Sequence, residues 1–214
     1  SGSGDYVAFI DDDERPSREW LRRLYEACQH WNADGVLGPV LPYFDSPPPK
    51  WVRDGKFFER PSHPDGYRLR WDECRTGNVL FKRIILGPGE IAFRPQFGTA
   101  GEDMDFFRRM IDKGCCFRWC DSAPVHELVP ANRCTWRFQI RRALLRGSNF
   151  PKHPANRVKN IAKSLIAVPL YTLALPVFAV SGSHVLLKFV IKLADHSSRL
   201  LAFSGIVLAN ERES

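Results

Sequence analysis

The stretch that decides the fold is Tyr6-Val-Ala-Phe-Ile-Asp-Asp-Asp-Glu14, an apolar run that ends in three consecutive aspartates. The pattern predicts a buried β-strand followed by an acidic turn. Three adjacent carboxylates repel one another and are costly to bury, so they favour a site for a cation or a metal–polyphosphate complex. In open α/β sheets, ligands bind beyond the carboxyl ends of strands, where this triplet would lie. A helix cap with solvated neighbours explains the triplet equally well at this stage.

A second acidic group follows a glycine-rich loop about ninety residues later. Gly98-Thr-Ala-Gly101 leads into Glu102 and Asp103, and the apolar residues that come next recur at helical spacing over 104–111. We therefore expect Glu102 and Asp103 to begin a helix. The helix dipole stabilises carboxylates in a first turn, so a purely structural role for this pair stays open.

The remaining residues before 150 alternate between patterns typical of helices and of strands, which predicts the α/β class. The stretch 42–72 holds Pro47-Pro48-Pro49 and many aromatic residues, and it predicts a long irregular excursion. The expected regular elements are a helix over 17–32, strands over 35–41, 79–81 and 115–120, and a basic helix over 134–147.

Charge is unevenly distributed along the chain. The net charge is +7, yet no acidic residue lies between Glu127 and Asp195. This asymmetry indicates an anionic partner for the C-terminal part: phosphates, nucleic acid or a membrane leaflet. No nucleic-acid recognition module accompanies the basic residues, so no nucleic-acid partner is expected. The span holds eleven basic residues: Arg133, Arg137, Arg141, Arg142, Arg146, Lys152, Arg157, Lys159, Lys163, Lys188 and Lys192.

Beyond residue 150 the composition becomes apolar. Residues 164–180 are almost wholly apolar but are interrupted by Pro169 and Pro176, and seventeen helical residues span only about 25 Å. Residues 184–209 form an amphipathic pattern with one polar stripe. We therefore predict two domains, 1–150 and 151–214, with residues 164–209 associating with a membrane as a peripheral, re-entrant or anchoring region. An ordinary core-packing helix pair is the alternative.

Three ordered motifs carry a resemblance to a known family. The stretches 6–14, Thr76-Gly77-Asn78 and Gly101-Glu-Asp-Met-Asp-Phe-Phe107 resemble the later motifs of family 2 glycosyltransferases with the GT-A fold. Val36-Leu-Gly-Pro-Val40, Pro49-Lys-Trp51 and Val125-His-Glu-Leu-Val-Pro-Ala-Asn-Arg133 are similar to the succinoglycan-type exopolysaccharide glucosyltransferases of bacteria. The resemblance covers about residues 4–150. It implies the C-terminal part of a Rossmann-like nucleotide-sugar transferase domain, without the N-terminal nucleotide-binding half, so we expect the chain alone to be inactive.

The resemblance implies a role for each candidate residue. Asp11 and Asp13 match the outer positions of the DxD motif and would hold Mg²⁺ or Mn²⁺ bound to the nucleotide diphosphate, with Asp11 and Asp12 also at the nucleotide. Asp103 matches the general base, and Glu102 would orient that base or the acceptor. The other residues implied at the site are Asn78 and Arg133 for the nucleotide sugar and His126 for the metal or a phosphate, although a structural loop role for His126 is equally open. The QxxRW motif of processive members is incomplete around Arg133, which disfavours polymerisation.

The implied function is that of an inverting, metal-dependent glycosyltransferase of exopolysaccharide biosynthesis. It would transfer a hexose, glucose from UDP-glucose, to a lipid-diphosphate-linked glycan at the cytoplasmic face of the inner (plasma) membrane. Six cysteines without disulfide spacing favour reduced thiols and this reducing compartment. The alternative is a catalytically incompetent transferase fragment that acts as a membrane-surface binding protein.

Overall fold

The computed structural model describes residues 4–87, 92–94, 101–149, 157–206 and 208. Contacts within the chain group it into two compact units, Ser1–Tyr43 with Glu59–Leu128, and Phe44–Phe58 with Val129–Ser214. We call these the first and the second unit. The grouping follows packing, whereas the predicted boundary at residue 150 follows composition and stays a prediction. Gly98–Ala100 of the predicted loop lies outside the described residues.

The first unit is built on a mixed sheet of four strands in the order β1-β5-β3-β6. Its strands are β1 (Tyr6–Ile10), β5 (Asn78–Lys82), β3 (Gly35–Leu37) and β6 (Phe117–Trp119). β5 is antiparallel to both β1 and β3, and β3 is parallel to β6. The α/β class is thereby confirmed, and the register places Ile10 opposite Asn78. The acidic triplet therefore begins where β5 begins.

A second, three-stranded sheet of the order β2-β7-β4 continues from this end of the first. It consists of β2 (Glu14–Pro16), β7 (Val125–Leu128) and β4 (Val40–Tyr43), with β2 antiparallel and β4 parallel to β7. The sequence predicted one strand over 35–41, but Gly38 and Pro39 separate β3 from β4, and the two strands join different sheets. β2 was not predicted because three residues are too few to show a period.

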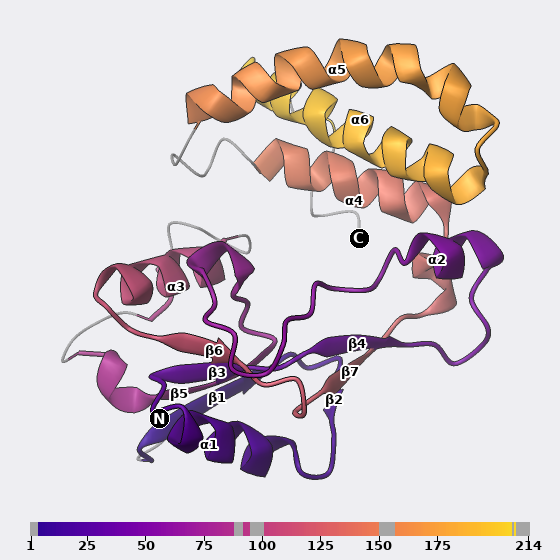
Figure 1. The fold of residues 1–214 in the computed structure, drawn as a ribbon. Coiled ribbons are helices and arrows are strands. Elements are labelled where there is room, and N and C mark those ends of the chain that lie inside the picture. Colours follow the sequence, from indigo (N-terminus) through magenta and orange to yellow (C-terminus); the bar gives the residue numbers. More distant parts are fainter. Residues whose placement is uncertain (1–3, 88–91, 95–100, 150–156, 207, 209–214) are drawn as a thin grey trace. The chain divides into compact units, whose positions relative to one another are not determined.

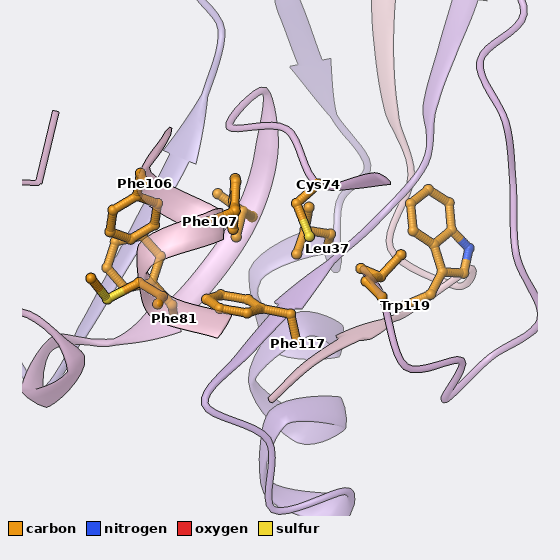
Figure 2. Close-up of a cluster of buried hydrophobic side chains, with 10 residues drawn as sticks. Leu37, Cys74, Phe81, Phe106, Phe107, Phe117 and Trp119 are labelled. Carbon is orange, nitrogen blue, oxygen red and sulfur yellow. The ribbon is translucent and has the colours of Figure 1, made fainter. Parts of the chain in front are cut away.

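Two helices cover opposite faces of the four-stranded sheet, α1 (Trp20–His30) and α3 (Glu102–Asp112) (Figure 1). Side chains along a strand point alternately to the two faces, and the burial follows this period. Val79 and Phe81 of β5 pack with Phe106 and Phe107 of α3, while Leu80 packs on the other face with the residues of α1. Figure 2 shows the aromatic rings of the first cluster. The predicted helices over 17–32 and 102–111 are confirmed.

The second unit is helical. It consists of α2 (Lys50–Gly55), α4 (Trp136–Asn149), α5 (Arg157–Ala179) and α6 (Ser183–Phe203), with α6 contacting the other three helices. α4 and α6 approach closely because Gly147 has no side chain, and a Cβ there would lie 2.6 Å from the carbonyl oxygen of Asp195. Asp195 also pairs with Arg146 at 3.0 Å and with Arg199 at 2.8 Å.

Two sequence expectations about these segments need correction. The stretch 42–72 is not wholly irregular, because Pro47–Pro49 is followed by α2, whose six residues are too few to reveal a helical period. α5 is one helix that runs through Pro169 and Pro176. Each proline removes one backbone hydrogen bond. Packing against α6 keeps α5 helical through both prolines. In this packing the rings of Phe178 and Phe189 are stacked, with their centroids 3.5 Å apart.

Candidate active site at the end of β1

The acidic triplet forms a tight turn between the two sheets of the first unit. The amide of Glu14 donates to the carbonyl oxygen of Asp11 at 3.1 Å, which closes a four-residue turn. The amide of Leu128 in β7 donates to the carbonyl oxygen of Asp13 at 3.4 Å. Asp11, Asp12 and Asp13 are exposed, as a ligand site requires, and they lie at the carboxyl end of β1 as predicted.

Glu14, which the sequence motif contains but to which it assigns no role, is the buried member of this turn. Its side chain is 0% exposed, and its Oε1 has no hydrogen-bond partner among the described residues. The pKa of Glu14 is raised to about 7, first by burial and second by the neighbouring charge of Asp11. A bond from the Asp11 amide, at 3.4 Å from Glu14 Oε2, and the charge of Arg60 oppose this rise in pKa.

Gly77 makes room for these two carboxyl groups. A Cβ at this position would lie 2.9 Å from both Asp11 Oδ2 and Glu14 Oε1, closer than a real Cβ tolerates. Asp11 could rotate into solvent, but Glu14 is buried and cannot. Glycine is therefore required here for the close approach of the acidic turn to the start of β5.

Arg60 supplies positive charge to this cluster from a loop remote in sequence. Its Nη2 lies 2.5 Å from Glu127 Oε2 and 3.8 Å from Glu14 Oε1. Although Asp11 is exposed as a residue, the protein around its carboxyl group removes part of its solvation and raises its pKa. The charge of Arg60 lowers this pKa, and nearby carboxylates including Glu127 raise it again. The sequence offered no signal for Arg60, because it follows an aromatic-rich stretch without a period or motif.

Asn78, predicted to contact the nucleotide sugar, is a buried crosslink of the fold. Its Nδ2 donates to the carbonyl oxygens of Pro39 at 3.0 Å and Ala123 at 2.9 Å, while its Oδ1 accepts from Trp20 Nε1 at 2.7 Å. The amide thus joins the start of β5 to α1 and to two connecting segments. These bonds support the position of Gly77 next to it. A direct contact of Asn78 with a nucleotide stays a prediction.

Glu102 and Asp103 open α3 as predicted, after Gly101, whose φ of 95° suits glycine. The Met104 amide donates to Asp103 Oδ1 at 2.8 Å, which orients the carboxylate. Asp103 also lies near Cys74: burial raises the pKa of this thiol, and the charge of Asp103 adds to the rise in pKa. Asp103 is thus near Cys74, and Asp11 lies over Gly77, so the two acidic sites border the same stretch of chain, residues 74–77.

His126 and Arg133 are not brought into this cluster by any described contact. His126 is exposed on β7 opposite Arg15, and side chains alternate along a strand, so it faces away from the side on which Glu127 meets Arg60. Arg133 lies in a short 3₁₀ turn of the second unit. Their predicted roles at the metal and the nucleotide sugar stay predictions.

The acidic turn suits Mg²⁺ or Mn²⁺ as an ion held jointly by protein and substrate. Among the described residues, His, Cys, Asp and Glu form no group of three that could hold a metal ion. Mg²⁺ is commonly bound by one or two carboxylates together with waters and substrate phosphates. The exposed carboxylates of Asp11 and Asp13 fit this donor set. The unpartnered Oε1 of Glu14, next to Asp11 over Gly77, indicates that the single guanidinium of Arg60 does not satisfy all the carboxyl groups at the turn.

Comparison with known proteins agrees with the motifs at this site. The chain is 32% identical over 169 residues to the succinoglycan biosynthesis protein ExoM of Rhizobium meliloti (strain 1021), covering 77% of this chain and 53% of the relative. The chain thus spans about half the length of the curated relative that it matches. Two crystal structures of S. aureus TarS 1-349, one in complex with UDP, align with TM-scores of 0.43 and 0.42 at 14% and 12% identity, over 95% of this chain and 67% of each.

The family model described as "Glycosyl transferase family 2" matches residues 2–84. This range contains β1, the acidic turn, Arg60 and Gly77, and therefore the candidate site apart from α3 and β7. Through this segment and its likeness to ExoM, the chain belongs to glycosyl transferase family 2.

Proposed function

We propose that the protein containing this chain is an inverting, metal-dependent glycosyltransferase of exopolysaccharide biosynthesis, which transfers glucose from UDP-glucose to a lipid-diphosphate-linked glycan. The observation that carries this proposal is the pair of acidic sites bordering residues 74–77. This reaction requires two groups: carboxylates that hold the ion–diphosphate complex, and a separate carboxylate that accepts the proton of the acceptor. The acidic turn supplies the first group and the start of α3 supplies the second.

In the proposed reaction, Asp103 accepts the proton of the acceptor hydroxyl while that oxygen bonds to the anomeric carbon. The bond from this carbon to the diphosphate breaks, and its electron pair stays on the departing UDP. Attack from the face opposite the diphosphate inverts the configuration. Mg²⁺ or Mn²⁺, when bound at Asp11 and Asp13, would neutralise charge on the diphosphate. Glu102, next to the base, would orient it or the acceptor.

Asp13→Asn tests the assignment of the acidic turn. In the full-length protein, this change is expected to weaken binding of UDP-glucose in the presence of Mn²⁺ by about tenfold or more, because a neutral amide is a poor ligand for a hard cation. Binding in EDTA should be unchanged. Isothermal titration calorimetry with and without Mn²⁺ measures both, and Asp45→Asn, which alters an exposed aspartate of the second unit, is the control. A wild-type Mn²⁺ dependence in Asp13→Asn would show that Asp13 does not hold the ion.

The second unit supports association of the protein with a membrane. Among the described residues, one helix is long and apolar enough to cross a membrane, Asn160–Ala179 within α5. Twenty helical residues span about 30 Å, the thickness of the hydrocarbon core. One face of this helix is exposed in the part of the unit that the structure describes. Its side chains, at spacings of four, three and four, are at least 61% exposed: Ile166, Leu170, Leu173 and Val177. We propose that this face contacts lipid acyl chains.

Leu173→Glu tests this contact. The change should reduce binding of the full-length protein to vesicles containing anionic lipid by at least about tenfold, since burying one leucine contributes about 1.5–3 kcal/mol and a charge is excluded from the acyl region. Vesicle flotation measures the bound fraction. Leu21→Glu, at a leucine of α1 that is also exposed, is the control. Equal flotation of wild type and Leu173→Glu would show that α5 does not mediate binding.

Transfer itself separates the two candidate functions. Radiolabelled UDP-glucose and a lipid extract from polysaccharide-producing bacteria should yield an organic-soluble labelled product with the full-length protein. If that protein binds vesicles but neither transfers glucose nor binds UDP-glucose, the membrane-surface binding role holds instead and the enzymatic proposal fails.

A further inference from the structure

Arg60 lies among three carboxyl groups that come from different elements of the first unit. These are Asp11 at the end of β1, Glu14 at the start of β2 and Glu127 in β7, and we call them with Arg60 the acidic cluster. Glu14 and Glu127 are directly paired across β2 and β7, an arrangement that is unfavourable for like charges. Arg60 offsets this repulsion, with Nη2 at 2.5 Å from Glu127 Oε2 and at 3.8 Å from Glu14 Oε1.

One guanidinium group does not satisfy the acidic cluster. The distance of 3.8 Å to Glu14 Oε1 is too long for a hydrogen bond, and this fully buried oxygen has no other partner among the described residues. Arg60 therefore donates a hydrogen bond to Glu127 and acts on Glu14 through its charge. Its side chain is 36% exposed, so the guanidinium can be reached from solvent as well as from the cluster.

We propose that Arg60 is the resident counter-ion of the acidic cluster, which weakens binding of a free divalent cation at Asp11 and strengthens binding of a nucleotide diphosphate. The inference rests on the proposed function for the assignment of Asp11 to the ion–diphosphate complex. Arg60 lies 3.8 Å from Glu14 Oε1, and this oxygen and Asp11 Oδ2 both border the space over Gly77. A positive charge this near to Asp11 repels a bare metal ion, while an exposed guanidinium donates hydrogen bonds to phosphate oxygens. The metal would then bind together with the nucleotide rather than before it.

Arg60→Gln is expected to change the two affinities in opposite directions. Binding of Mn²⁺ alone should become about tenfold tighter, because a like charge is removed from beside the ion. Binding of UDP in EDTA should become about tenfold weaker, because a charge-assisted contact is lost. Electron paramagnetic resonance of free Mn²⁺ and calorimetry of UDP measure these affinities. A purely structural role of Arg60 would weaken both together, and this result would overturn the inference.

Two further variants make the test specific. Arg60→Lys keeps the charge and should leave the Mn²⁺ affinity within about threefold of wild type, which also provides a result if Arg60→Gln does not fold. Arg22→Gln is the matched control, since Arg22 is an exposed arginine of α1 that pairs with two glutamates, Glu19 and Glu26. If the wild-type protein binds Mn²⁺ and UDP, and Arg60→Gln leaves both affinities unchanged, the inference about Arg60 is wrong while the proposed function still stands. Wild-type protein that binds neither overturns the proposed function as well.

Discussion

Asp103→Asn is expected to lower the rate of glucose transfer by at least about a hundredfold while leaving the affinity for UDP-glucose within about threefold of wild type. The asparagine amide cannot accept the proton of the acceptor hydroxyl. It keeps an oxygen in the position of Asp103 Oδ1, so it can still accept the Met104 amide that orients the native carboxylate at 2.8 Å. The start of α3 should therefore remain intact.

Initial rates with radiolabelled UDP-glucose, and calorimetry of UDP-glucose binding, measure the two effects in the full-length protein. Asp112→Asn is the matched control, because Asp112 is an exposed aspartate near the other end of α3. If Asp103→Asn instead weakens UDP-glucose binding strongly and keeps the wild-type rate of transfer at saturating donor, Asp103 belongs to the donor site and is not the base.

The stability of the first unit is expected to fall by about 3 kcal/mol as the pH rises from 4.5 to 8, because of Glu14. The pKa of Glu14 is about 7 in the fold, above the ordinary value of 4.5. Between these two values the folded state binds more protons than the unfolded state. The contribution of Glu14 is therefore fully present below pH 4.5 and is lost as the pH rises through 7. Asp11, whose pKa is also raised, acts in the same direction.

Glu14→Gln removes this titration and should flatten the pH profile. Urea unfolding of the full-length protein at pH 5, 6, 7 and 8 measures the profile, and hydrogen–deuterium exchange of the β1 and β5 peptides reports the first unit by itself. Glu26→Gln, at an exposed glutamate of α1, should keep the wild-type slope. Parallel profiles for wild type and Glu14→Gln would show that Glu14 is not the group responsible.

Local patterns were sufficient for the elements that carry the acidic residues. The apolar run before Asp11 predicted β1, and the helical spacing after Asp103 predicted α3, because each element buries one side in a regular period. The short elements β2 and α2 were not predicted. β2 and α2 have three and six residues, so no period develops within them. Pro169 and Pro176 indicated interruptions, yet contacts with α6 hold α5 as one helix.

The sequence alone determined the α/β class of this protein and the positions of the acidic residues at the end of β1 and at the start of α3. Ordered motifs around Asp11, Gly77 and Asp103 identified the family, since they stand at the ends of predictable elements. Only the tertiary structure decided what surrounds Asp11. Glu14 is buried beside it, Gly77 leaves the space for both carboxyl groups, and Arg60 reaches the cluster from a loop some fifty residues away. These contacts depend on which strands pair and on how closely backbone segments approach one another. The periodicity of residues along the chain does not predict either.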